Sequence, residues 1–131
     1  MRKVIALSLF CLLFTACSRS NKTEVTGHVL LDEKPVTYGV ISFWPSDGVG
    51  PSAQGLIQDG KYRLEVPPGE KKVGVEAVEK TGEHALPGSE SIKVTSHKAV
   101  SPESYHSPDQ TTLTCTISPE AKVHDFRLSS R

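Results

Sequence analysis

From residue 24 onward, apolar and polar side chains alternate along this chain with a period of two. Tyr62, Leu64 and Val66, for example, alternate with charged neighbours, and residues 72–77 and 112–117 follow the same pattern. A period of two is typical of β-strands that bury one face and expose the other. The alternation therefore predicts an all-β fold.

Turn-forming residues separate the predicted strands. Asp59-Gly60 lies between two alternating segments as a two-residue hairpin turn whose glycine can adopt a positive φ, and residues 67–69, Pro-Pro-Gly, end the next segment. Short strands with turns at this spacing are typical of an antiparallel sandwich. With four weaker segments included, we predict seven strands, at residues 25–31, 39–44, 53–58, 61–66, 72–77, 112–117 and 123–128.

Composition excludes several classes of protein. The 131 residues include 15 Lys or Arg and 15 Asp or Glu, so the formal charge is zero. Nucleic-acid binders normally carry a basic surplus, so no nucleic-acid partner is expected. Three cysteines are too few for a disulfide scaffold. The length is that of one domain.

The first twenty residues have the order of a signal peptide. Basic Arg2 and Lys3 precede an apolar stretch at 4–14, which is too short for a transmembrane helix. Residues 13–18, Leu-Phe-Thr-Ala-Cys-Ser, resemble the lipobox of bacterial lipoproteins, although Phe14 stands where an aliphatic residue is usual. This resemblance implies cleavage between Ala16 and Cys17 and lipidation of Cys17. The alternative is ordinary secretory cleavage near Ala16.

The lipobox reading divides the chain into three parts: a signal peptide at 1–16, a lipidated Cys17 with a polar tether at 17–23, and a β-sandwich at 24–131. Acyl chains such as palmitate on Cys17 would hold the protein to membrane lipid, since each buried methylene contributes about 0.8 kcal/mol. Ser18 after the cysteine, rather than Asp, favours by resemblance the outer membrane. We therefore expect a cell-envelope protein that faces the periplasm or the cell surface.

Residues 79–110 are predicted to form a long connection with little alternation. Connections of this length are often functional, so four residues in or beside it are candidates for a binding surface: His84, His97, Tyr105 and His106. The alternative is a passive surface excursion with a short extra hairpin. The three histidines are separated by 13 and 9 residues, which matches no standard ligand pattern, so no metal site is predicted.

Four side chains, Tyr105 again among them, are expected to have structural roles. Tyr105 is expected to pin the long connection to the sandwich, and Cys115 to act as a small buried apolar side chain. Trp44 is expected in the core, the alternative being a platform for sugar stacking. Lys71 is expected to be solvated at the start of a strand.

The strands and turns resemble those of a known family. Residues 25–36, VTGHVLLDEKPV, resemble the opening of carboxypeptidase regulatory-like domains, with Glu33 where glycine is usual. The DGKYRL run at 59–64 and the PESY run at 102–105 also resemble segments of this family. The resemblance spans residues 24–128. It implies a transthyretin-like sandwich, related in architecture to immunoglobulin-like domains, with an accessory binding role beside other proteins or glycans.

The enzymes with related domains have motifs that this chain lacks. Zinc carboxypeptidases need a His-x-x-Glu pair, and none of the five histidines has Glu at that spacing. Transthyretin-like 5-hydroxyisourate hydrolases end in Tyr-Arg-Gly-Ser, whereas this chain ends in Leu-Ser-Ser-Arg. We therefore predict no catalytic residue, no cofactor and no enzymatic activity. The expected function is protein interaction or structural support in the envelope, the alternatives being carbohydrate or envelope-polymer binding and, third, a transthyretin-like hydrolase.

Overall fold

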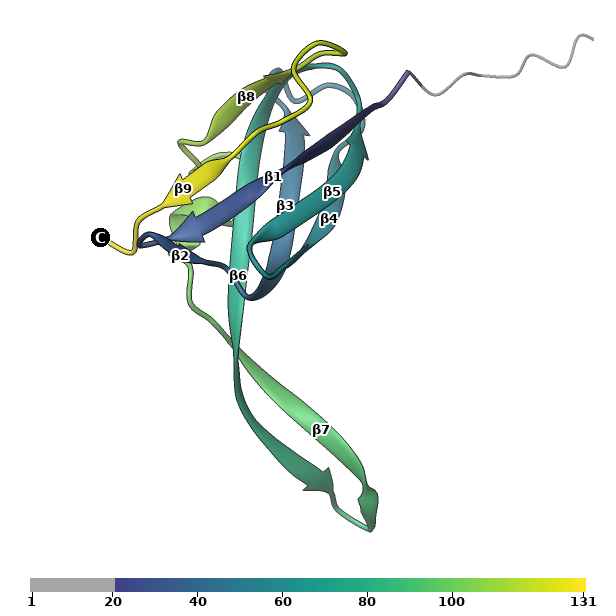
Figure 1. Ribbon diagram of the computed structural model, residues 1–131, viewed down its shortest axis with the longest axis vertical. Helices are drawn as coiled ribbons and strands as arrows, with labels where there is room; N and C mark the ends of the chain where they lie inside the picture. The colour runs from purple at the N-terminus through teal and green to yellow at the C-terminus, as the bar shows by residue number, and fades with distance from the viewer. Residues whose placement is uncertain (1–20) are drawn as a thin grey trace, which may run out of the picture.

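The computed structural model describes residues 21–131 and confirms the all-β prediction (Figure 1). All seven predicted segments contain strands. Two further strands are β2, which forms a small hairpin with β1, and β7, which lies in the predicted connection. The strands are β1 (Thr23–Leu31), β2 (Lys34–Pro35), β3 (Tyr38–Pro45), β4 (Ala53–Gln58), β5 (Lys61–Val66), β6 (Gly69–Leu86), β7 (Ser89–Ala99), β8 (Thr114–Ile117) and β9 (Phe126–Leu128).

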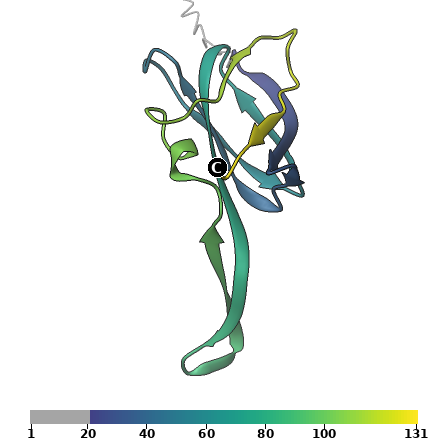
Figure 2. The same ribbon diagram turned by 90° about the vertical axis from the view of Figure 1, so that its left-hand side faces the viewer.

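The strands form one curled sheet in the order β2-β1-β5-β4-β3-β6-β7, with β8 paired to β6 and β9 paired to β1. Figures 1 and 2 show that the sheet curls into a half-closed barrel around its core. Neighbouring strands are antiparallel except β1 and β9, which are parallel, with Val29 opposite Phe126. The final strand thus returns beside the first.

Side chains on the inner face of the curled sheet form one hydrophobic core. Three aromatic rings, Phe43, Tyr62 and Phe126, have centroids 6.0 to 6.3 Å apart. Edge-to-face and tilted rings at this separation add to the stabilisation from burial. The other large, fully buried side chains are aliphatic: Val25, Val29, Ile41, Ile57, Val66, Val73, Val75 and Ile117.

Two short turns have positive φ at both central residues. Asp59 and Gly60 have φ of 52° and 75°, which confirms the predicted hairpin turn between β4 and β5. Asp32 and Glu33, between β1 and β2, have φ of 49° and 65°. Such turns match the right-handed twist of the strands, and glycine enters the left-handed region at the lowest cost. Glu33 is therefore at a position where glycine would be the less strained residue.

Residues 79–99 differ from the predicted irregular connection. The second half of β6 pairs with β7 from Val78–Ala99 to Leu86–Ser89, with irregularities after Lys80 and after Ala85. Figures 1 and 2 show this ribbon projecting from the barrel, and we call residues 79–99 the arm. Both its faces lie in solvent, so backbone pairing could form it without strict alternation of apolar and polar residues. The extra hairpin is therefore long, and only 100–110 remains a mostly irregular connection.

The predicted leader and anchor lie outside the described residues. This includes the signal peptide at 1–16, the cleavage site at Ala16 and Cys17, and most of the tether. From residue 21 to the C-terminus, no helix is long and apolar enough to cross a membrane.

Candidate functional site

The candidate residues of the long connection lie in two places. His84 and His97 are exposed on the arm, where His84 Nδ1 lies 3.4 Å from Ser96 Oγ. The ring of His97 lies beside that of Tyr38 on β3, with centroids 6.0 Å apart. Because Ser96 and His97 are adjacent in a strand, the two histidines project from opposite faces of the arm.

Tyr105 and His106 lie where the arm joins the barrel, at and just after the 3-10 helix η1 (Glu103–Tyr105). The Tyr105 hydroxyl accepts a hydrogen bond of 3.3 Å from the Ser129 N–H, and its ring packs against the core. His106 Nε2 lies 2.8 Å from the Ser101 hydroxyl, which also accepts the Ala77 N–H. Tyr105 therefore pins the connection to the barrel, as predicted.

The four residues were predicted to form one binding surface, but the structure does not bring them together. His84 and His97 face opposite ways on the arm, whereas Tyr105 and His106 are half-buried at its base. Within residues 21–131, no group of three His, Cys, Asp or Glu side chains is arranged to hold a metal ion.

Two aliphatic side chains are exposed near the tip of the arm. Gly82 pairs with Ser96 and His84 with Val94, so these residues share a face. Leu86 and Ile92 lie nearer the tip of the arm, where the pairing of β6 with β7 is irregular after Ala85. Leu86 and Ile92 are 41% and 52% exposed. The arm thus presents aliphatic side chains to solvent at a distance from the barrel.

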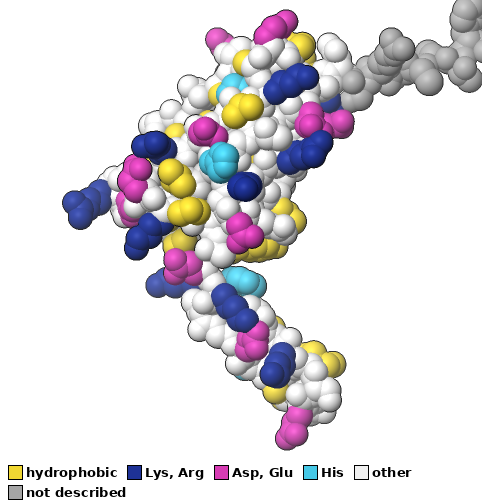
Figure 3. Space-filling view, in the orientation of Figure 1, with side chains coloured by type: hydrophobic (Ala, Val, Ile, Leu, Met, Phe, Trp, Pro, Cys, Tyr) yellow, Lys and Arg dark blue, Asp and Glu magenta, His cyan; other side chains and the backbone are white. Residues whose placement is uncertain are grey.

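A second candidate surface is a broad, shallow depression of about 900 Å³ on the outer face of β4, β5 and β1. No sequence pattern points to this depression, because most of its residues occupy the ordinary outward positions of alternating strands. Figure 3 shows basic, acidic, histidine and hydrophobic side chains interspersed on this side of the barrel. The depression is lined in part by His28, Leu56, Lys61, Arg63 and Val123.

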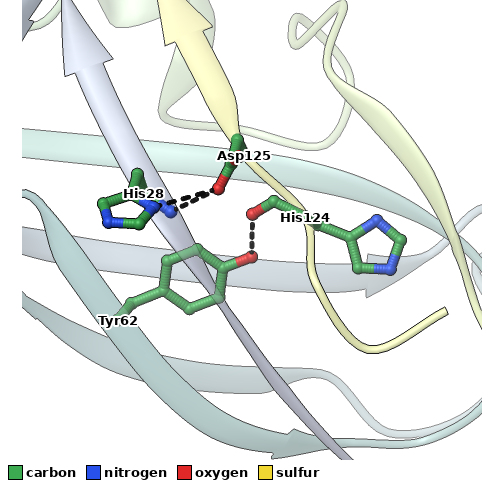
Figure 4. Close-up of polar contacts among 4 residues, drawn as sticks. All are labelled: His28, Tyr62, His124 and Asp125. Atoms are coloured by element: carbon green, nitrogen blue, oxygen red, sulfur yellow. Dashed lines mark hydrogen bonds and ion pairs between the residues drawn. The ribbon is translucent and has the colours of Figure 1, made fainter.

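A set of polar contacts lies at the edge of this depression (Figure 4). Asp125 Oδ1 accepts the His28 backbone N–H at 2.8 Å and lies 3.3 Å from His28 Nδ1. The backbone hydrogen bond is the main cause that lowers the pKa of Asp125, and the imidazole adds to it. The Tyr62 hydroxyl donates to the His124 carbonyl at 2.6 Å, and burial raises the Tyr62 pKa.

These contacts attach the β9 segment to the rest of the sheet. Asp125 binds β1 through His28, while Tyr62 of β5 reaches the backbone of His124. The side chains of His28 and Asp125 are 59% and 60% exposed, and an ion pair this exposed contributes little to stability. Attachment of the last strand to the sheet accounts for this arrangement.

Trp44 does not lie in the core, contrary to the prediction. Phe43 precedes it and points inward, so Trp44 points to the outer face of β3, where it is half-buried. There its ring covers Gly74, and a Cβ on that glycine would lie 2.3 Å from the indole. The period of two around Phe43 could have predicted the outward direction of Trp44, because neighbouring residues of a strand point to opposite faces. The ring is packed on the backbone of β6 and is only partly open for stacking.

Lys71 and Cys115 lie side by side at one end of the core. Lys71 is only 4% exposed, which corrects the prediction of a solvated side chain, because it shares the inward face of β6 with Val73. It pairs with Cys115 of β8, which is half-buried and packs against the core. Burial raises the pKa of the Cys115 thiol to about 11, so the thiol is protonated at neutral pH.

Comparisons with known proteins identify no family for this chain. No family model matches it, and no curated protein matches either. Among solved structures, a 9R-lipoxygenase from Cyanothece PCC8801 aligns at 15% identity with a TM-score of 0.35. The alignment covers 83% of this chain and 16% of the lipoxygenase chain. A similarity this weak carries no argument about fold or function.

Proposed function

We propose that this chain is a lipid-anchored envelope protein that binds another protein through its arm and has no catalytic activity. The observation that carries the proposal is the arm itself, a two-stranded ribbon that leaves the barrel with Leu86 and Ile92 exposed. An isolated two-stranded ribbon is marginally stable in water. A partner that covers these aliphatic side chains or extends the ribbon would stabilise it.

The direction of the arm also supports a protein partner. Figure 1 shows the arm leaving the barrel at the end opposite the start of β1 at Thr23. In our proposal the acylated Cys17 lies six residues before Thr23, so the tether would span at most about 20 Å. The anchor would then hold the opposite end of the barrel at the membrane, and the tip would be free to meet a protein.

The proposed envelope location rests on the signal-peptide pattern and the lipobox resemblance. Residues 25–36 resemble carboxypeptidase regulatory-like domains, which serve as accessory binding domains beside other proteins or glycans. The proposed role agrees with that role. Membrane lipid, bound through acylated Cys17, would be the second partner.

The alternative function is carbohydrate or envelope-polymer binding. The depression on β4, β5 and β1 favours it, because Leu56 offers an apolar surface beside the cationic Lys61 and Arg63. Against it, Trp44, which would be the natural stacking platform, is packed over Gly74 outside this depression.

Photo-crosslinking in intact cells tests the proposal. A benzophenone amino acid replaces Ile92 on the arm or, in the matched control, Glu65 on the exposed outer face of β5. We expect the same identified protein to be captured repeatedly from position 92 and not from position 65. Absence of any protein adduct at position 92, with the chain present at the normal level, would reject the arm as a binding element.

A further inference from the structure

Within residues 21–131, the outer face of β3 and β4 carries no charged side chain. The two strands pair in one regular register, residues 38–43 against 53–58. Ile41, Phe43 and Ile57 are fully buried, so the residues that alternate with them point outward. These outward residues, which we call the β3–β4 strip, are Tyr38, Val40, Ser42, Trp44, Gln54, Leu56 and Gln58. The core beneath the strip therefore fixes its orientation.

The lack of charge is confined to the strip. Charged residues make up 23% of the chain, and the neighbouring strands carry them on their outer faces. Lys61 of β5 lies opposite Gln58, and Glu76 of β6 lies opposite Val40. A charged polymer would gain no ion pair from the residues of the strip, whereas an uncharged ligand needs none. The charge pattern therefore favours an uncharged ligand.

The strip combines aromatic, aliphatic and carboxamide groups. Tyr38 and Trp44 lie at its two ends, about 20 Å apart at the rise of a β-strand. Leu56, between them, is 53% exposed, and Tyr38 is 40% exposed. Gln54 Nε2 donates a hydrogen bond of 3.1 Å to Ser42 Oγ, which leaves the Gln54 carbonyl oxygen to accept one from a ligand. Flat apolar groups thus alternate with groups that can both donate and accept.

A hollow of about 290 Å³ adjoins the Trp44 end of the strip. Half-buried Trp44 and exposed Gln54 line it on the side of the strip, and Glu76 and His106 line it on the side of β6 and the connection after the arm. Ligand pockets begin at about 300 Å³, so a hollow of this size accepts one ring of a larger ligand. Its carboxylate and imidazole can form hydrogen bonds with hydroxyl groups.

We propose that the β3–β4 strip binds an extended, uncharged polysaccharide, with one sugar ring in the hollow beside Trp44 and the chain continuing past Leu56 toward Tyr38. Sugar rings offer apolar C–H faces to aromatic rings and hydroxyl groups to carboxamides. This inference goes beyond the proposed function, because it adds a second ligand on a surface that the arm does not provide.

The strip shares part of its border with the depression on β4, β5 and β1. Leu56 lines both surfaces, and Gln58 also lines the depression. Substitutions that separate the two surfaces are therefore those of unshared residues. Tyr38 belongs to the strip alone, and Lys61 belongs to the depression alone.

Tryptophan fluorescence tests the proposal directly, because Trp44 is the only tryptophan of the chain. The full-length protein, in a detergent without sugar groups, is titrated with cellohexaose, chitohexaose and maltohexaose, and with polygalacturonate as the anionic control. We expect a saturable change with at least one neutral hexasaccharide and none with polygalacturonate. Lack of saturable binding to all three hexasaccharides up to about 10 mM, in fluorescence and in calorimetry, would overturn the inference.

Substitutions locate the ligand on the strip. Tyr38→Ala should weaken hexasaccharide binding in calorimetry about tenfold, because one stacking contact is lost while the exposed position leaves the core unchanged. Trp44→Ala should abolish binding. Because Trp44 also covers Gly74, Trp44→Phe provides a variant that keeps an aromatic ring there, and it should retain measurable binding. The matched control, Lys61→Ala, should bind like the unmodified chain.

The outcomes separate this inference from the proposed function. Weakened binding in Lys61→Ala but not in Tyr38→Ala would place the sugar in the depression and overturn the strip. Capture of a protein in intact cells by a benzophenone amino acid at position 56, without hexasaccharide binding, would show a protein on this face and overturn the polysaccharide. Capture from position 92 without hexasaccharide binding would leave only the proposed function standing. Hexasaccharide binding without capture from position 92 would leave only this inference standing.

Discussion

At the scale of single residues, one hydroxyl joins two parts of the molecule that are far apart in sequence. The Tyr62 hydroxyl bonds the carbonyl of His124, and its ring packs with Phe43 and Phe126. Burial raises the Tyr62 pKa, so the phenol remains a donor throughout the neutral range. The side chain thus contributes both apolar burial and a directed hydrogen bond.

Tyr62→Phe should lower the free energy of unfolding by about 1 to 2 kcal/mol, because the His124 carbonyl loses its donor while the ring still fills the core. Urea unfolding followed by circular dichroism measures this loss. The matched control is Tyr38→Phe, at a ring that is 40% exposed on the outer face of β3, which should change stability by less than about 0.5 kcal/mol. Equal effects of the two substitutions would show that the His124 contact contributes nothing.

Asp125 makes stability depend on pH in the acid range. Hydrogen bonding to the His28 N–H lowers its pKa below the ordinary 3.8. A carboxyl group with a lowered pKa stabilises the fold above its unfolded value, and this contribution is lost as the pH falls through the folded value. We expect Asp125→Asn to lose less stability than the unmodified chain between about pH 7 and about pH 3.

Urea unfolding at the two pH values measures that difference. Asp109→Asn, at an exposed aspartate, provides the control and should retain the pH dependence of the unmodified chain. Identical pH dependence in Asp125→Asn would show that this carboxylate is not coupled to folding.

At the scale of secondary-structure elements, the arm is separate from the core while β6 is shared between them. The first half of β6 packs between β3 and β8, and its second half pairs with β7. None of residues 79–99 belongs to the core cluster. Ser101, Tyr105 and His106 tie the end of the arm to the barrel.

Removal of the arm should therefore leave the barrel folded. Replacing residues 81–96 by Asn-Gly would join Lys80 to His97, which are paired, through a two-residue hairpin turn. We expect the free energy of unfolding to change by less than about 0.5 kcal/mol, with loss of the partner captured from the arm. A large loss of stability would place the arm in the cooperative folding unit and remove the main argument for a dedicated binding element.

At the scale of the whole molecule, the described chain is a folded unit on its own. The core cluster extends from Val25 to Leu128, and β9 returns beside β1 to close it. The proposed anchor at Cys17 precedes this unit, whose described core residues begin at Val25. We therefore expect the proposed attachment to the membrane to be separable from folding of the barrel.

Cys17→Ala tests this separation. Without the thiol no acyl chain can be attached to sulfur, so palmitate incorporation should be abolished and the protein should leave the membrane fraction. Its circular dichroism spectrum and unfolding curve should match those of the unmodified chain. Continued incorporation of palmitate would show that the lipobox assignment is wrong.

The candidate surfaces were only partly predictable from sequence. Residues 79–110 were singled out for their length, and two candidate residues, His84 and His97, lie on the arm. Tyr105 and His106 instead support its base, and the depression on β4, β5 and β1 was missed. Whether an outward side chain lines a hollow depends on how strands from distant parts of the chain curve together, which no local pattern records.

The seven predicted strands and the turn at Asp59-Gly60 follow from local sequence, because alternation and turn chemistry are properties of neighbouring residues. Tertiary structure alone decided three features: the arm with its solvated faces, the burial of Lys71 and the parallel return of β9 to β1. Each depends on which strand edges meet. Every residue carries a backbone C=O, and every residue except proline also carries an N–H. The local sequence of a strand therefore does not show which other strand will pair with it.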